Sequence, residues 1–206
     1  MGQSLHIHPQ NLQLRLINQC IEILNKGGII VYPTDSGYAM GCKLDNKNAL
    51  MQICRLSQLD SRHNFTLMCR DLSEIAEYAY LDNQVFRMIK NSTPGHYTFI
   101  LRATKEVPRR IMNKKRKTIG IRLPNNPIAR DLLAGIGEPL LSTSLILPGE
   151  DFAQSSSYEI ESLIGQQVDL IINVGYLSEK PTTVVDLTES MPNIIRVGMG
   201  STIPFE

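Results

Sequence analysis

The sequence lacks the features by which several common classes of protein are recognised. Its four cysteines, Cys20, Cys42, Cys54 and Cys69, form no close pair, whereas disulfide frameworks and metal centres usually contain such pairs. No stretch reaches the ~18 apolar residues that a membrane-spanning helix needs. The first residues show no basic region followed by an apolar run, as a signal peptide would. We therefore expect a cytoplasmic protein that does not associate with membranes and keeps its thiols reduced.

Three catalytic motifs are also missing. The chain contains no GxSxG, no HExxH and no GxxxxGK[ST], which excludes the common nucleophile elbow, the zinc-protease helix and the P-loop. Among the four histidines only His6 and His8 have a metal-ligand spacing, and they lie at the terminus. We expect no metal site, and an enzyme built from this sequence would rely on positioning and electrostatic stabilisation rather than on a covalent triad.

The composition is that of one globular domain. The chain has 206 residues, of which 42% are apolar and 20% are charged, enough for a sizeable core in a single domain spanning residues 1–206. The formal net charge of +1 gives no general preference for nucleic acid.

Helical and extended patterns alternate along the chain. Residues 14–24 have apolar side chains at helical spacing and end at Gly27-Gly28, as a left-handed cap would. Further helices are predicted over residues 46–56, 71–91 with a break near 81–82, 127–134 and 155–164. Strands are predicted over residues 29–32, 65–69, 98–102, 118–123, 140–147, 168–174, 182–187 and 194–197. Pro33 is expected to stop the first strand because it has no N–H to donate. Some connections are too short for crossovers, so the pattern predicts an α/β fold with a mixed sheet.

Short polar segments adjoin a proline or glycine at the ends of several predicted strands. They contribute hydroxyls, backbone amides and arginines, which suit phosphate or carboxylate. Singly, each is typical of loop chemistry, because Ser and Thr near turns usually bond their own backbone. Together they favour a site for an anionic small molecule. The segments are Thr34-Asp35-Ser36, residues 94–98, residues 118–124, Ser142-Thr143-Ser144, residues 181–183 and residues 196–198.

A strongly basic segment precedes the strand predicted at residue 118. Its six cations are Arg109, Arg110, Lys114, Lys115, Arg116 and Lys117. One interpretation is a solvated loop, and the other is attraction of polyanions such as a nucleotide triphosphate or an RNA backbone. No aromatic residue is interleaved, so the sequence does not indicate base stacking. RNA bound here would show strong salt dependence and little sequence preference.

Six motifs, in order, resemble those of the YrdC/YciO family, and the YciO branch in particular. The resemblance covers about residues 27–198 and implies a twisted, open mixed sheet, flanked by helices, around a deep, positively charged cavity (the YrdC/RibB-like fold). In that family the cavity holds threonine, bicarbonate and ATP with Mg²⁺, and the product, threonylcarbamoyl-AMP, serves tRNA modification. The motifs are YPTDSGYAMG at 32–41, PGHYTFIL at 94–101, TIGIRLP at 118–124, STS at 142–144, PTTVVDL at 181–187 and IIRVG at 194–198.

The resemblance implies roles for individual residues. Arginine forks suit carboxylate and phosphate, and hydroxyls fix orientation. The substrate-binding residues implied are Thr34, Arg122, Ser142 and Thr182. The nucleotide-binding residues implied are Arg55, Thr118, Ser144 and Arg196.

The sequence departs from the family pattern at several of these places. Arg55-Leu56-Ser57 stands where the family has Lys-x-Arg, and Ser144 stands where it has Asn. Cys69 stands where a substrate-binding histidine is usual. Arg62 or His63, in a longer loop nearby, is a candidate to replace the lost cation. Losing a cation that stabilises transferring phosphate removes several kcal/mol of transition-state stabilisation, so we expect weak or altered synthesis.

Three functions remain open at this point. The first is threonylcarbamoyl-AMP synthesis by nucleotidyl transfer from ATP. The second is binding of double-stranded RNA or association with ribosomes through the basic segment, with vestigial catalysis. The third is a related ligase or nucleotide hydrolase that acts on another small acid.

Overall fold

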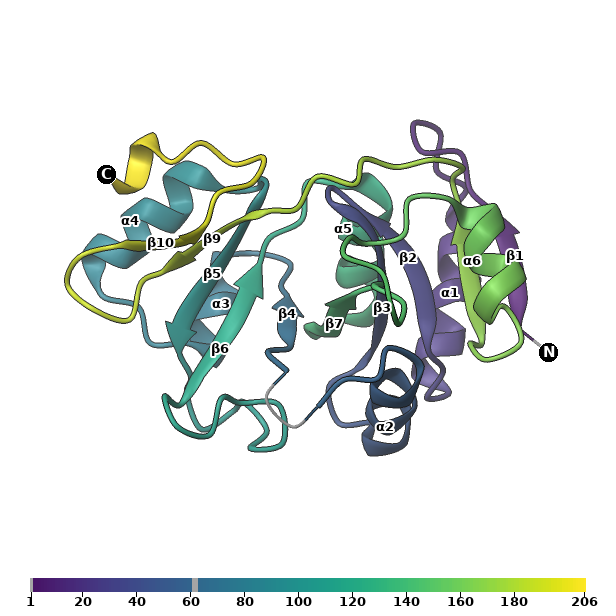
Figure 1. Cartoon of the computed structure of the whole chain (residues 1–206), viewed down its shortest axis with the longest axis horizontal. Helices are drawn as coiled ribbons and strands as arrows, with labels where there is room; N and C mark the ends of the chain where they lie inside the picture. The colour runs from purple at the N-terminus through teal and green to yellow at the C-terminus, as the bar shows by residue number, and fades with distance from the viewer. Residues whose placement is uncertain (1, 61–62) are drawn as a thin grey trace.

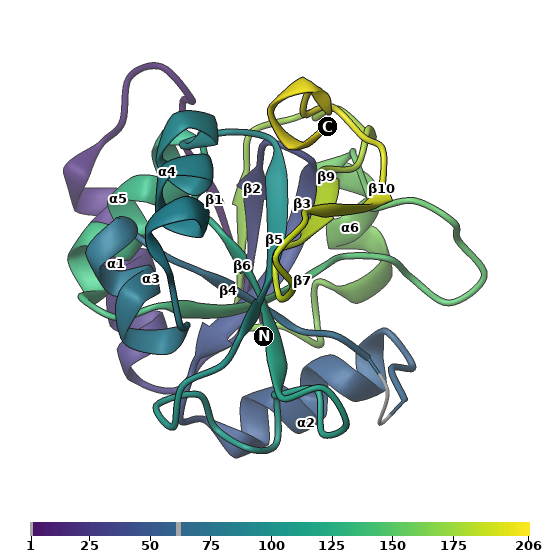
Figure 2. The same ribbon diagram turned by 90° about the vertical axis from the view of Figure 1, so that its left-hand side faces the viewer.

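The backbone forms one large, twisted sheet (Figure 1). The computed structural model describes residues 2–60 and 63–206, and the strand order in them is β1-β8-β2-β3-β7-β4-β6-β5-β9-β10. Figure 2 shows how strongly the strands fan out. The strands are β1 (Gln3–His6), β2 (Ile30–Thr34), β3 (Gly37–Lys43), β4 (Thr66–Met68), β5 (Tyr97–Arg102), β6 (Thr118–Arg122), β7 (Leu140–Ser144), β8 (Leu170–Asn173), β9 (Thr183–Asp186) and β10 (Asn193–Arg196).

The sheet is mixed, as predicted. Strand β2 pairs antiparallel with β3 but parallel with β8, and β6 pairs parallel with β4 but antiparallel with β5. The helices flank it, and α1 packs on α5. The helices are α1 (Leu14–Asn25), α2 (Lys47–Leu56), α3 (Leu72–Tyr78), α4 (Asn83–Ser92), α5 (Pro127–Ile136) and α6 (Ser157–Ile164), with a 3-10 turn at Ile203–Phe205.

Strand β2 is buried on both sides, which explains its uninterrupted apolar sequence. Ile30 and Tyr32 pack in one apolar core with α1 and α5, whereas Ile29 and Val31 pack in a second core with residues of α2 and α6. Because successive side chains of a strand point to opposite faces, one short segment joins both cores.

The prediction that Pro33 ends the first strand is wrong. The strand continues to Thr34, and Pro33 lies opposite Tyr38 of β3. The carbonyl of Tyr38 accepts from Leu145 N rather than from β2. On the other side, β8 pairs only with Ile30 and Val31. Since neither neighbouring strand has an acceptor for an amide at Pro33, the missing N–H costs no ladder hydrogen bond.

A tight hairpin therefore follows, which the sequence pattern did not predict. Asp35 and Ser36 form the turn between β2 and β3, and Gly37 has a φ of +90°, a value that favours glycine. Strand β3 was missed because its small and glycine residues lack the usual β-branched signal. Strand β1 was also missed.

The predicted helix boundaries are close to the observed ones because short polar residues cap them. Asn46 accepts a hydrogen bond from Ala49 N at the start of α2, and Asn126 does so from Ile128 N at the start of α5. The predicted break near residues 81–82 is confirmed, since Asp82 begins α4 by accepting from Val85 N. Across the described residues, no helix has the length and apolar character needed to cross a bilayer.

Candidate anion-binding site

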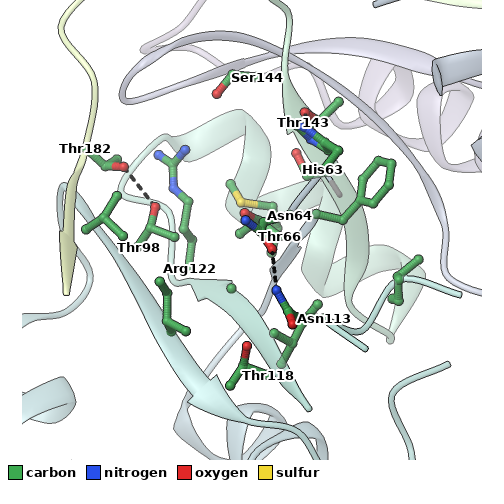
Figure 3. A pocket seen from close by; sticks show the side chains of 18 of the residues that line it. His63, Asn64, Thr66, Thr98, Asn113, Thr118, Arg122, Thr143, Ser144 and Thr182 are labelled. Carbon is green, nitrogen blue, oxygen red and sulfur yellow. Dashed lines mark hydrogen bonds between the residues drawn. The ribbon is translucent and has the colours of Figure 1, made fainter. Parts of the chain in front are cut away.

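A cavity of about 380 Å³ lies against strands β4 to β7, β9 and β10 (Figure 3). It brings together six of the eight side chains predicted to contact substrate or nucleotide, although they come from three strands and a loop. The six are Thr118, Arg122, Ser142, Ser144, Thr182 and Arg196. Among the described residues that line the cavity, three are arginines and none is Asp or Glu.

Arg122 is the most constrained of the three arginines. It stands at the end of β6, and its side chain is 7% exposed. Its NH2 group donates to the Asp35 carboxylate and its NH1 group donates to Ser36 Oγ over 3.0 Å. The buried Nε has no hydrogen-bond partner among the described residues. The β2–β3 turn therefore fixes the guanidinium while leaving one donor unsatisfied, which is costly unless a ligand accepts from it.

Asp35 also joins this turn to a histidine. Its carboxylate is 5% exposed, and its Oδ2 atom lies 3.1 Å from Nδ1 of His96, just before β5. Asp35 was noted in the sequence only as part of a polar segment. Its role in holding Arg122 depends on residues 87 positions apart, so spacing gave no signal for it.

Arg196 and two threonines form a second fixed group beside Arg122. Arg196 NH2 donates to Thr182 Oγ1 over 3.2 Å, and Arg196 Nε donates to the Thr182 carbonyl. The hydroxyls of Thr98 and Thr182 are 2.8 Å apart. Figure 3 shows Arg122 pointing toward this threonine pair. Burial and the nearby charge of Arg122 lower the pKa of Arg196, so an anion placed here would relieve the repulsion between the two guanidiniums.

Arg116 reaches the cavity from the basic segment. Its NH2 group lies 2.6 Å from Asp186 Oδ2 and also donates to Thr188 Oγ1. Burial opposes the charged form of Asp186, but hydrogen bonds from Thr188 and Arg116 outweigh it and lower the pKa of Asp186. The prediction grouped Arg116 with the RNA-binding cations, whereas the structure also places it in the cavity wall.

The opposite wall carries polar groups: His63, named from the sequence as a candidate to replace the lost cation, and Asn64 and Asn113, which the sequence did not single out. His63 Nε2 lies 2.9 Å from Thr143 Oγ1, and burial lowers the pKa of His63. Asn113 donates to Asn64 over 3.3 Å, and Figure 3 shows both near Thr66. Such amide and imidazole groups donate and accept hydrogen bonds without adding charge, which suits a nucleobase, a ribose or an amide.

Two predicted contact residues do not line the cavity. Thr34 is buried in the β2–β3 turn, where its hydroxyl donates to Gly37 O and accepts from Ser36 N. Arg55 faces another groove, next to Gln52 and Leu147. Ser57 is buried and its hydroxyl has no partner among the described residues. Arg62, named as a substitute cation, lies outside the described residues.

The remaining predicted RNA-binding residues are on the surface. Arg109, Lys114, Lys115 and Lys117 are exposed, on the connection between β5 and β6 at the bottom of Figure 1. Arg110 is exposed as well and donates to Leu44 O, which ties the connection to the end of β3. The site therefore has two parts, a walled cavity and an exposed basic loop, and Arg116 belongs to both.

A twisted mixed sheet whose strand ends bring arginines and hydroxyls into one cavity defines an α/β protein with a candidate site for an anion. Residues 22–198 match the model of the Sua5, YciO and YrdC proteins, which is described as telomere recombination. The chain belongs to the Sua5/YciO/YrdC family.

Named relatives agree with this assignment. YciO of Escherichia coli K12 is 60% identical over 205 residues and all of both chains, and its crystal structure superposes with a TM-score of 0.96. A putative threonylcarbamoyl-AMP synthase of Methanocaldococcus jannaschii is 28% identical, over 86% of this chain and 83% of the other. The fold is also that of P. abyssi Sua5 complexed with L-threonine, with a TM-score of 0.88 at 21% identity, over 96% of this chain and 58% of that one.

Proposed function

We propose that the protein is a threonylcarbamoyl-AMP synthase-like nucleotidyltransferase with weak activity. In the proposed reaction, a carboxylate oxygen of N-carboxythreonine, formed from threonine and bicarbonate, attacks the α-phosphorus of ATP. The bond from that phosphorus to the bridging oxygen breaks, and pyrophosphate leaves. The product is the activated carbamoyl donor for tRNA modification.

One observation carries this proposal: the buried guanidinium of Arg122, fixed by Asp35 and Ser36, has a donor left without a partner beside Arg196 and Thr182. Fixed donors stabilise charge more effectively than mobile ones, because they need no reorganisation during the reaction. Arginine pairs also match the geometry of carboxylate and phosphate. In the proposal this end of the cavity holds the reacting anionic groups.

The neutral wall then holds the nucleoside. His63, Asn64 and Asn113 offer donors and acceptors at the other side of the cavity, next to Thr118, which the family resemblance assigns to the nucleotide. Mg²⁺ prefers oxygen ligands and usually combines one or two carboxylates with substrate phosphates. No described lining residue is acidic, so the donor set does not fit a resident Mg²⁺, and the ion would enter with ATP as part of the substrate.

The departures from the family pattern argue for slow turnover. Neither Arg55 nor Ser57 belongs to the described lining of the cavity, and Ser144 offers a hydroxyl where the family has an amide. Fewer cations on the transferring phosphates mean less transition-state stabilisation. The protein should therefore bind the nucleotide more effectively than it converts it.

Pyrophosphate release tests the proposal. With ATP and Mg²⁺ present, threonine and bicarbonate are omitted one at a time, and pyrophosphate is assayed over long incubations. The expected result is slow release that needs both co-substrates and is abolished in Arg122→Gln, while Arg55→Gln, outside the cavity, behaves as wild type. Release at a rate typical of efficient enzymes, ~10 s⁻¹, would contradict the weak-activity claim, and release without threonine would point to the hydrolase or another acid.

The exposed loop favours RNA binding as a second candidate function. Lys114 and Lys115 do not line the cavity and form no ion pair among the described residues. Such cations bind phosphate backbones without reading sequence. The affinity for RNA should then fall steeply as salt rises. Lys114→Glu with Lys115→Glu tests this without touching Arg116, and an unchanged affinity and salt slope would remove the candidate.

A further inference from the structure

A second groove adjoins the cavity on the side of the basic loop. It has a volume of about 590 Å³ and is open to solvent. Arg116 and Thr118 line both the groove and the cavity, so the two adjoin at these residues. The groove adds Arg102, Lys117, Thr188, Glu189 and one aromatic residue, Tyr80.

Tyr80 is a rigidly mounted, solvent-facing ring. Tyr80 is 66% exposed, but its backbone is held in place because the Tyr80 N–H donates to Arg102 O over 2.9 Å. On either side, Thr104 N donates to Tyr78 O, and Ala79 bridges to Ala103. The segment after α3 is thereby joined to the end of β5. A large aromatic ring left in water on a fixed backbone offers a stacking surface at little cost in conformational entropy.

The cations around the ring are held by the same framework. Arg116 is fixed by Asp186 and Thr188. Lys117 has a φ of +52°, and its carbonyl accepts from Ala103 N. The backbone of this residue is therefore fixed in the groove that Tyr80 also lines. Arg102 pairs with Glu189 only at 3.5 Å, and both side chains are well exposed, so a phosphate can displace the carboxylate.

The charge around the groove is concentrated. Residues 102–117 contain eight of the 21 lysines and arginines but only one acidic residue, although the whole chain is almost neutral at +1. This asymmetry creates a local positive potential that attracts polyanions. Proteins that bind single-stranded nucleic acids combine aromatic rings, on which the bases stack, with cations that contact the phosphates.

We propose that this groove binds a nucleotide of single-stranded RNA, with its base stacked on Tyr80 and the adjoining phosphates on Arg102 and Lys117. The strand continues over Lys114 and Lys115 on the exposed loop. The inference rests on the second candidate function above and makes it specific, because it replaces non-specific attraction by a defined base-binding surface. The sequence did not indicate base stacking because Tyr80 is distant from the basic segment in the chain.

Fluorescence anisotropy with a short, labelled oligouridylate tests the proposal, using a duplex RNA and an oligothymidylate of equal length for comparison. Tyr80→Ala should weaken binding of the single-stranded RNA roughly tenfold, the loss expected for one base–aromatic stack. Tyr80→Phe keeps the ring and should bind as wild type. Tyr176→Ala removes another exposed tyrosine, 75% exposed and outside the groove, and should have no effect. Duplex binding should be unchanged in all three variants.

The outcomes distinguish RNA binding by the exposed loop from base stacking on Tyr80 in the groove. If Tyr80→Ala binds as wild type while Lys114→Glu with Lys115→Glu loses binding, the loop binds RNA but the groove does not, and the stacking proposal is overturned. If wild type binds none of the oligonucleotides, RNA binding itself is wrong. Tighter binding of duplex than of single strand, insensitive to Tyr80, would also overturn the proposal. Equal effects on the oligothymidylate would show that the groove does not distinguish RNA from DNA and would overturn its assignment to RNA.

Discussion

The cations of the cavity wall and those of the exposed loop are held in different ways. Arg122 and Arg116 are each held against a buried carboxylate, Asp35 and Asp186, whereas Lys114 and Lys115 lie in water on the loop. A fixed arginine presents its remaining donors in one direction and selects a ligand by geometry. A free lysine attracts any anion and is screened by salt. We therefore propose that the cavity recognises one anionic ligand, whereas the loop attracts anions in general.

The largest effect is expected from Arg122→Gln. Removing one member of a buried, hydrogen-bonded charge pair leaves Asp35 without its main partner and removes a guanidinium that lines the cavity. Such truncations cost about 2 kcal/mol or more, so the affinity for ATP–Mg²⁺ should fall roughly 30-fold or more. Equilibrium dialysis measures the affinity, and circular dichroism checks that the fold is retained. A variant that folds and binds within about twofold of wild type would place the nucleotide elsewhere.

Asp186→Asn sharpens the comparison, because it converts a fixed arginine into a free one. Without the carboxylate, Arg116 loses the 2.6 Å contact that holds it at the cavity wall. Nucleotide affinity should fall roughly tenfold, the size of one charge-assisted hydrogen bond, while RNA affinity at low salt should rise. If both affinities stay unchanged, the carboxylate does not position Arg116.

The same substitution should change acid stability. The pKa of Asp186 is lowered below its ordinary value of 3.8 in the folded protein. The carboxylate therefore contributes stability above that pH, and the contribution is lost as pH falls through the folded pKa. Urea unfolding between about pH 5 and pH 3 should show a weaker pH dependence in Asp186→Asn than in wild type. An identical dependence would mean that Asp186 is not stabilised by its contacts.

Reversing the loop charges should have a moderate effect on kinetics and little on nucleotide affinity. Lys114→Glu with Lys115→Glu removes steering of anions toward the cavity, so the association rate of ATP–Mg²⁺ at low salt should fall several-fold and become less salt dependent. The equilibrium affinity should stay within about twofold. Stopped-flow measurements at two salt concentrations provide the test, and a large loss of affinity would mean that these lysines contact the nucleotide.

The smallest effect is expected at the neutral wall. Burial lowers the pKa of His63 below its ordinary value of 6.5. The folded protein resists protonation there, so stability is complete above pH 6.5 and declines as pH falls toward the folded pKa. His63→Gln should remove this decline and leave nucleotide affinity at neutral pH nearly unchanged. If the stability of His63→Gln declines with falling pH as much as that of wild type, other groups cause the decline.

Much of the fold follows from local patterns in the sequence, but which strands lie side by side in the sheet does not. Alternating helices and strands, and polar groups at strand ends such as Thr118 and Thr182, were predicted because local propensity and packing agree there. Pro33 and strand β3 were misjudged because the tolerance of a proline depends on which neighbour lies beside it.

The parts of the site that depend on long-range contacts were not predictable. Asp35 holds Arg122 and Asp186 holds Arg116 across 87 and 70 residues of sequence. Tyr80 approaches the basic loop only because its segment bonds to the end of β5. Arg55, assigned by the family pattern, faces a different groove. Residue identity suggested the chemistry, and only the three-dimensional arrangement showed which groups act together.

The most direct test is a calorimetric titration of ATP–Mg²⁺ into three proteins side by side: wild type, Arg122→Gln, and Lys114→Glu with Lys115→Glu. If the fixed arginines recognise the nucleotide, wild type and the loop variant bind one nucleotide with similar affinity, and Arg122→Gln shows no saturable heat. If Arg122→Gln binds as wild type and the loop variant does not, the nucleotide is held by the exposed cations, and the cavity is not its binding site.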